Sequence, residues 1–411
     1  MKKILFDATV LVDGNDMIEE RRGIYFVARN LLLEMCRQNQ AEILLFASTY
    51  KEAGLGLVAS ELGIDVKPYK KNSFFSRKLH SIVTYCRKKR LEKGSGFARK
   101  CIFSALILVL SAVSSLLYSV INFNCKFDKD TVFFSPRTSA PWFISRHKEI
   151  KKFVVLHDLI PVLFKESPEL LRWGWFAHLI RTLNQNDGYF AISENTKRDF
   201  LDYCADMKSS QIHVVSWAAG SDFAKHDNLI EREKLAAKYA FPNEKKYVLA
   251  LGVSNPRKNV ERIVRSFVAF KEKNRIDDLI LIVAGSPINK DDGPVLYRSY
   301  VDDKDLPLFY SFAEWFVFTS QYEGFGLPPL EAMQCGCPVI ASSNSSIPEV
   351  IGDAGLIIDW DSDEQHVDAY EKYYFDETLR NGNGRKGMER AKLFSWEKTV
   401  KEILSTIKES R

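Results

Sequence analysis

The segment of this 411-residue chain that is best suited to chemistry carries two glutamates, Glu323 and Glu331, with a short turn between them. The turn residues are Gly324, Phe325, Gly326 and Leu327. Their glycines let the backbone approach a ligand closely, and the two prolines that follow suit the first turn of a helix. The N–H groups of such a helix start, together with the helix dipole, bind phosphate or a similar anion. The two carboxylates can therefore contact different parts of one extended ligand that is rich in hydroxyl groups.

The elements that must position these residues follow an alternating strand and helix pattern. Apolar runs predict strands at 4–6, 42–46, 131–134, 153–156, 188–192, 212–215, 247–251, 279–284, 315–318, 339–341 and 356–358. Helical patterns lie between several of these runs, including 24–35 and 260–271. Continuous apolar strands alternating with helices predict parallel sheets that are covered on both faces, which is the α/β class.

A polar and charged stretch at 222–246 separates the two halves of this pattern. We therefore expect an N-terminal domain at 1–222, a second domain at 223–385 and a closing helix within 386–411. In such open sheets, ligands bind beyond the carboxyl ends of the strands. The ligand is thus expected in a cleft between the two domains.

The motif EGFGLPPLEAM at 323–333, with GCPVIAS, SIPEV and GDAGL after it, resembles the retaining glycosyltransferases of the large group-4 family. The resemblance implies the GT-B fold, in which two Rossmann-like domains face each other across a cleft. By position, Glu323 would contact the donor sugar near the reacting carbon, and Glu331 would bind the ribose hydroxyls of the nucleotide. Backbone N–H groups of 324–327 would meet the sugar and the diphosphate.

Three further segments share this resemblance. GVSNPRKN at 252–259 is similar to the family's donor-phosphate loop, so Lys258 with Arg257 would neutralise the leaving diphosphate. LHDLIP at 156–161 is similar to its sugar-side loop, with His157 and Asp158 facing the donor. RGIYFVARNLL at 22–32 resembles the loop that opens the first helix, and this makes Gly23 a candidate contact for substrate.

The reaction implied by the resemblance is transfer of a hexose from a nucleotide-diphosphate sugar to a glycan or polyprenyl-linked acceptor, with retention at the anomeric carbon. The leaving phosphate would itself take the acceptor proton, and no metal or other cofactor would be needed. GDP-mannose is the expected donor because this letter pattern is common among its users. Such a transfer would serve the synthesis of cell-surface polysaccharide.

Two rival functions remain open on the sequence. A glycoside hydrolase would use Glu323 and Glu331 as its acid pair, but eight residues of helix separate them by about 12 Å, against about 5 Å or 6.5–9.5 Å for known pairs. A non-catalytic scaffold of a polysaccharide assembly complex would bind no nucleotide sugar. Cys335 and Cys337 form a single pair without partner ligands, so no metal site is expected.

The charge of the chain is unevenly distributed. The total is +5, but residues 67–100 hold twelve Lys or Arg and one acid, a local net charge of +11 that leaves −6 for the rest. Residues 101–125 carry no charge. A basic block before an apolar block favours a membrane surface over nucleic acid. A single membrane span would separate strands of one sheet, so this element within 67–130 must lie in the interface, dip in and return, or be buried in protein.

The cysteines and the N-terminus point to the cytoplasm. Seven scattered cysteines do not form a disulfide framework, and the apolar run near the N-terminus stops at Asp7 and is typical of a first strand. We therefore expect a cytoplasmic protein that is peripheral at the inner face of the plasma membrane.

Overall fold

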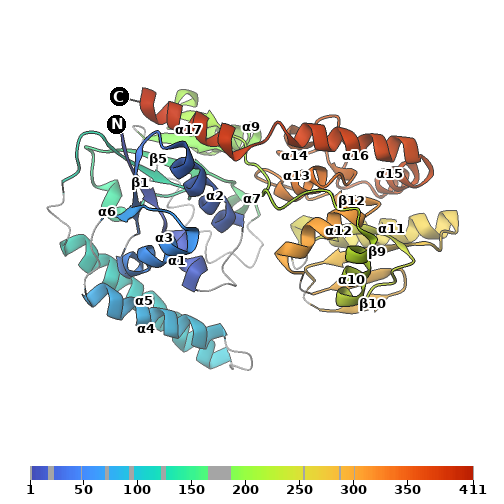
Figure 1. Ribbon diagram of the computed structural model, residues 1–411, viewed down its shortest axis with the longest axis horizontal. Coiled ribbons are helices and arrows are strands. Elements are labelled where there is room, and N and C mark those ends of the chain that lie inside the picture. Colours follow the sequence, from blue (N-terminus) through green and yellow to red (C-terminus); the bar gives the residue numbers. More distant parts are fainter. Residues whose placement is uncertain are drawn as a thin grey trace.

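The computed structural model describes residues 2–16, 23–47, 49–69, 74–91, 97–121, 126–164, 187–252, 255–286, 288–299 and 301–410. Two α/β bodies stand side by side, and α17 (Trp396–Glu409) lies along the first of them (Figure 1). Each body contains one seven-stranded sheet. The expected architecture of two parallel-sheet α/β domains is therefore confirmed.

The first sheet is parallel throughout, in the order β3-β2-β1-β4-β5-β6-β7. Its strands are β1 (Lys3–Asp7), β2 (Glu42–Phe46), β3 (Lys67–Pro68), β4 (Thr131–Ser135), β5 (Lys151–Leu156), β6 (Gly188–Ala191) and β7 (Ile212–Val214). Helices of this domain include α1 (Thr9–Asp16), α2 (Gly23–Gln38), α3 (Leu55–Leu62), α6 (Trp142–Ser145), α7 (Ile160–Leu163) and α9 (Glu194–Tyr203). The central strands β4 and β6 are buried at every residue, because helices cover both faces of the sheet.

The second sheet has the order β10-β11-β9-β8-β12-β13-β14. Its strands are β8 (Lys246–Leu251), β9 (Leu279–Ala284), β10 (Lys290–Asp292), β11 (Val295–Arg298), β12 (Trp315–Phe318), β13 (Val339–Ser342) and β14 (Leu356–Ile358). Its helices are α10 (Leu229–Tyr239), α11 (Val260–Asn274), α12 (Leu306–Phe312), α13 (Leu327–Gln334), α14 (Ile347–Ile351), α15 (Asp363–Phe375) and α16 (Glu377–Ala391). The chain runs outward from β8 in one direction and from β12 in the other, so the strand order reverses between these two neighbours. Such a reversal opens a crevice at their carboxyl ends.

Three short strands and several helices, among them α10, were not predicted from the sequence. Strand β3 has two residues, β10 is a polar and fully exposed edge strand, and β11 is the other half of that hairpin. Helix α10 lies inside the polar stretch 222–246 and contacts α12. Only one side of this helix is buried, and its charged exposed side gave the stretch the composition of a linker.

Residues 74–121 form a helical hairpin, α4 (Phe74–Leu91) and α5 (Phe97–Ile121), at the lower edge of the first domain in Figure 1. The two helices pack through an apolar cluster of Leu79, Val83, Ile107 and Leu110. Asp13 of α1 anchors the hairpin, since its carboxylate binds Nζ of Lys51 at 2.5 Å and Nη1 of Arg87 at 2.6 Å.

One face of α5 carries apolar side chains that no part of the described chain covers. The exposed residues are Ile102, Leu106, Leu108, Val109 and Val113. Four of them recur at the i, i+4, i+7 and i+11 spacing of one helical stripe. The alternative that this element is buried in protein is therefore wrong for this face of α5. Among the described helices, none is both long enough and apolar enough to cross a bilayer.

The last helix, α17, joins the end of the chain to the first domain. Its apolar residues Val400, Ile403, Leu404 and Ile407 are buried, at the spacing of one helix face, and α17 packs against α2. Ser395 caps the helix by accepting a hydrogen bond from the N–H of Lys398.

Candidate active site

Glu323 and two cations meet at the crevice of the second sheet. Lys258 and Arg257 lie in the short 3₁₀ turn after β8, and Glu323 follows β12. Oε1 of Glu323 lies 2.6 Å from Nζ of Lys258 and 2.8 Å from Nη1 of Arg257. Burial by itself would raise the pKa of Glu323, but the charges of Lys258 and Arg257 hold it below its ordinary value. Glu323 is therefore an ionised carboxylate between two cations.

The backbone around Glu323 is held by two serines of the loop before α14. The Ser345 hydroxyl accepts a hydrogen bond from the N–H of Glu323 at 3.0 Å. The Ser346 hydroxyl lies 2.9 Å from the carbonyl oxygen of Glu323 and 2.8 Å from that of Phe325. The orientation of the catalytic candidate thus depends on a loop that follows β13.

Gly324 lies where the two domains approach each other closely beside this site. A Cβ atom at this position would stand 2.2 Å from the carbonyl oxygen of His157 and 3.0 Å from Cβ of Asp158. The Gly324 carbonyl accepts hydrogen bonds from the hydroxyls of Ser193, at 2.9 Å, and Thr196, at 3.1 Å. The structure therefore brings the 323–324 turn of the second domain against the 157–158 loop of the first.

His157 is a neutral imidazole in this arrangement. Its Nε2 lies 2.7 Å from the carbonyl oxygen of Pro136, which can only accept, so Nε2 carries the proton. Burial lowers the pKa of His157 to about 4. Asp158 uses Oδ1 to accept a hydrogen bond from the N–H of Ile160 at the start of α7.

Glu331 lies on α13 and has different partners from Glu323. Its carboxylate accepts a hydrogen bond from the Tyr310 hydroxyl of α12 at 3.3 Å. Burial raises the pKa of Glu331 to about 7, against the opposing effect of that hydrogen bond. Two glutamates of one motif therefore have opposite pKa shifts.

The remaining predicted site residues lie in the turn before α13 and at the start of α2. Gly326 has φ of 112° and Leu327 begins α13, as the predicted turn into a helix requires. The Phe325 side chain is buried against Phe394, so only its backbone faces the turn. Gly23 is the exposed first residue of α2, and the loop residues 17–22 before it lie outside the described part of the chain.

Sequence reasoning missed a group of residues that join the domains beside Glu323. The Glu349 carboxylate of α14 accepts hydrogen bonds from the N–H groups of Glu194 and Asn195, both at 2.8 Å. The Tyr322 hydroxyl is hydrogen-bonded to Asp199 of α9. The motifs that contain these residues were visible in the sequence, but their pairing across 120 or more residues was not.

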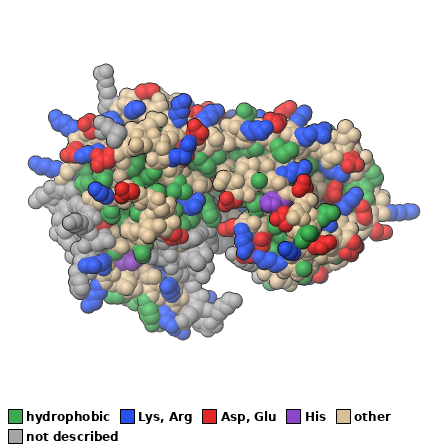
Figure 2. Space-filling model, in the orientation of Figure 1, with side chains coloured by type: hydrophobic (Ala, Val, Ile, Leu, Met, Phe, Trp, Pro, Cys, Tyr) green, Lys and Arg blue, Asp and Glu red, His purple; other side chains and the backbone are tan. Residues whose placement is uncertain are grey.

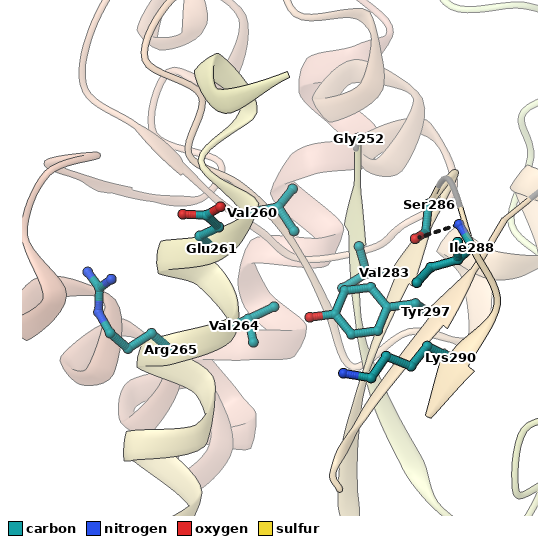
Figure 3. A pocket seen from close by; sticks show the side chains of 10 residues that line it. All are labelled: Gly252, Val260, Glu261, Val264, Arg265, Val283, Ser286, Ile288, Lys290 and Tyr297. Carbon is teal, nitrogen blue, oxygen red and sulfur yellow. Dashed lines mark hydrogen bonds between the residues drawn. The ribbon is translucent and has the colours of Figure 1, made fainter. Parts of the chain in front are cut away.

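A separate pocket of about 480 Å³ lies within the second domain between α11 and the β9–β11 edge (Figure 3). Tyr297, Val264 and Val283 face one another across it, and the charged side chains Arg265 and Lys290 lie at its sides. None of the site residues predicted from the sequence lines this pocket, and it plays no part in the contacts between the domains.

The overall fold is shared with solved structures. HepE from Anabaena, solved in complex with UDP and glucose, superposes on this chain with a TM-score of 0.66 at 14% identity. The match covers 100% of both chains. Residues 231–390, which include Lys258, Glu323 and Glu331, match the family model of glycosyl transferases group 1. The chain therefore has the GT-B fold, and its second domain is similar to the group 1 glycosyl transferases.

Two curated relatives of this chain are Escherichia coli proteins. The serotype-specific mannosyltransferase WbdA is 29% identical over 314 residues, which is 72% of this chain and 37% of WbdA. The O-antigen chain mannosyltransferase B is 36% identical over 178 residues, which is 39% of this chain and 45% of that protein. The chain thus spans less than half the length of either relative.

Proposed function

We propose that this chain transfers mannose from GDP-mannose to a glycan or polyprenyl-linked acceptor, with retention at the anomeric carbon, in cell-surface polysaccharide synthesis. The observation that carries this proposal is the buried cluster of Glu323, Lys258 and Arg257 at the strand-order reversal, next to Gly324, which lies against the backbone of His157 in the other domain. Under the proposal, residues 1–222 are the acceptor side, 223–385 the donor side, and 386–411 the closing segment.

The two cations fit the charge that develops on a leaving diphosphate. As the bond between the sugar carbon and the phosphate oxygen breaks, Lys258 and Arg257 would stabilise the negative leaving group. The acceptor oxygen would form the new bond on the same face, and its proton would pass to the leaving phosphate. Because both charges come from the protein, we propose that the reaction needs no metal.

The remaining residues take supporting roles in this proposal. Glu323, ionised by its neighbours, would stabilise the positive charge on the sugar ring, and the neutral His157 would bind a sugar hydroxyl. Glu331 would bind the ribose hydroxyls, and the backbone N–H groups of 324–327 would contact the diphosphate. Asp158 and Gly23 complete the proposed substrate contacts.

The choice of sugar rests on the relatives. Both E. coli relatives are named as mannosyltransferases, whereas HepE was solved with UDP and glucose. Mannose is favoured because the relatives share 29% and 36% sequence identity with this chain, against 14% for HepE.

We also propose that the protein works at the inner face of the plasma membrane, with the α4–α5 hairpin on the lipid. The exposed apolar stripe of α5 lies on the same hairpin as the exposed basic residues Arg77, Lys78, Lys88, Arg99 and Lys100. Hydrophobic side chains appear with Lys and Arg beside them at the lower edge of this domain in Figure 2. Apolar insertion with basic residues on anionic headgroups is the pattern of a peripheral membrane element.

The substitution Glu323→Gln tests the proposed chemistry. It keeps a hydrogen-bond acceptor beside Lys258 but removes the negative charge, so mannose transfer should fall by at least about 100-fold. The measurement is transfer from radiolabelled GDP-mannose to a polyprenyl-linked acceptor, with thermal unfolding as the check on folding.

The matched control is Glu389→Gln in the same domain, where the carboxylate is exposed and pairs with Lys392 three residues away. This variant should transfer at the wild-type rate. Transfer by a folded Glu323→Gln protein at the rate of the control would exclude the proposed role of Glu323.

A further inference from the structure

The first turn of α9 is capped from two different domains. A helix begins with four N–H groups that have no partner within the helix. Ser193 is the N-cap: its hydroxyl accepts from the N–H of Thr196 at 3.0 Å, and its carbonyl accepts the first bond within the helix, from the N–H of Lys197 at 3.1 Å. Two more of the N–H groups without a helical partner, on Glu194 and Asn195, donate to the carboxylate of Glu349.

Glu349 binds this helix start with both of its oxygens. Oε2 lies 2.8 Å from the N–H nitrogen of Glu194, and Oε1 lies 2.8 Å from that of Asn195. A carboxylate at a helix N-terminus is favoured by the helix dipole as well as by the hydrogen bonds. The second domain therefore supplies the acceptor for two N–H groups at the start of a helix in the first domain, and these groups lose that acceptor if the domains separate.

The same short segment of the second domain supports Glu323. Ser345 and Ser346 hold the backbone of Glu323, and α14 begins at the next residue and carries Glu349 on its first turn. A rigid connection of three residues thus runs from the helix cap to the backbone of Glu323.

Two further contacts place α9 against the same turn. The Thr196 hydroxyl lies 3.1 Å from the Gly324 carbonyl oxygen, and it also lies 3.3 Å from the carbonyl oxygen of His157. Tyr322, one residue before Glu323, reaches Asp199 on the next turn of α9. The start of α9 therefore contacts both sides of the proposed active site.

We propose that Glu349 is a positioning residue that clasps the two domains and so sets the distance between Glu323 with its cations and His157. The proposal rests on the proposed transferase function for its kinetic consequence, although the clasp itself does not. Because Lys258, Arg257 and Glu331 all belong to the second domain, that domain binds the nucleotide with or without the clasp. Loss of the clasp should therefore slow transfer and leave nucleotide affinity almost unchanged.

Hydrogen exchange and kinetics of Glu349→Ala test this inference. We expect faster exchange of the amides of Glu194 and Asn195, which lose their acceptor, and also of those at 323–326, which lose their support from the other domain. The turnover rate should fall by about tenfold or more, since hydrogen bonds to a charged group are lost, while the dissociation constant of GDP should change less than about twofold. Glu349→Gln keeps one acceptor oxygen and should give smaller changes of the same kind.

Glu272→Gln is the matched control, because Glu272 is an exposed residue near the end of α11 in the same domain. A Glu349→Ala protein with unchanged exchange at 323–326 and control-like turnover would show that Glu349 merely caps α9. If Glu349→Ala does not fold, Glu349→Gln is judged by the same readouts. If the wild-type protein transfers no sugar, the proposed function fails, and exchange at 323–326 still decides whether the clasp exists.

Discussion

At the scale of single residues, burial has opposite consequences for the two glutamates of the motif. Glu323 lies between two cations that offset the cost of burying its charge, so the carboxylate stays ionised. Glu331 has a neutral hydroxyl as its partner, so burial favours the protonated form. A carboxyl that titrates near neutral pH can donate a hydrogen bond to a ribose hydroxyl or accept one from it.

The raised pKa of Glu331 predicts a pH-dependent stability. Its pKa rises from 4.5 to about 7 on folding, so the folded state binds the proton more tightly and this residue's contribution to stability falls as pH rises through that window. Glu331→Gln mimics the neutral acid. We therefore expect the variant to unfold about 2–4 °C above wild type at about pH 8, and at nearly the wild-type temperature at about pH 5.

Thermal unfolding of wild type and Glu331→Gln across this pH range checks the direction of the stability change. The control Glu389→Gln, at an exposed residue, should change the unfolding temperature only slightly, and by the same amount at both pH values. A Glu331→Gln effect that does not change with pH would contradict the titration.

At the scale of elements, the α4–α5 hairpin is both firmly anchored and open to solvent. Asp13 carries the negative charge between Lys51 and Arg87, and all three side chains are at most 18% exposed. Burial lowers the pKa of Lys51 even though the charge of Asp13 opposes this shift, so the ammonium group needs its carboxylate partner to remain charged. The anchor fixes the hairpin to the first domain, so that its apolar stripe is presented on a rigid support.

Membrane docking by this hairpin predicts loss of vesicle binding when the stripe is made polar. Ile102 and Val109 are 65% and 58% exposed, so replacing both by Ser should leave folding intact and weaken binding to vesicles containing phosphatidylglycerol by at least about tenfold. Flotation of the protein with such vesicles, and with neutral phosphatidylcholine vesicles, measures the effect.

Ile288→Ser is the matched control, because Ile288 is 57% exposed but lies in the second domain. Binding of wild type should also weaken at high salt, as expected for basic residues on an anionic surface. Equal flotation of the double variant and the control would rule out docking through α5.

At the scale of the whole molecule, the two domains meet at the proposed site. Gly324 of the second domain touches the backbone of His157 in the first, and Trp396 of α17 packs on Trp217 with ring centroids 5.6 Å apart. The first contact lies beside Glu323, and the second belongs to the segment that returns to the first domain. Their positions determine how closely the two domains approach each other.

Gly324→Ala should therefore disturb the relation between the domains. The added Cβ would stand 2.2 Å from the His157 carbonyl oxygen, and this backbone atom cannot move aside as a flexible side chain can. We expect a larger radius of gyration in small-angle scattering and a transfer rate lowered by at least about tenfold, because small misplacements of reacting groups are costly.

Gly382→Ala provides the control, since nothing lies within 4 Å of a Cβ added at that helical position. It should leave both the scattering and the transfer rate at wild-type values. A compact and fully active Gly324→Ala protein would show that the contact at Gly324 does not limit the approach of the domains.

The sequence by itself determined the α/β class, most of the strands and the two motifs that contain Lys258 and the glutamates Glu323 and Glu331. These follow from local patterns: buried strands are continuously apolar, and glycine and proline are required where a strand turns into a helix. Short edge strands such as β10 carry no such pattern, because their side chains face water.

Only the tertiary structure decided which distant residues meet. It paired Glu323 with Lys258 and Arg257, placed Glu349 on the start of α9, and exposed the apolar stripe of α5. The sequence left open whether that stripe was buried, since apolar residues at helical spacing fit a protein core and a lipid surface equally well. The contacts across the cleft arise from the relative placement of two sheets, and no local spacing in the chain encodes that placement.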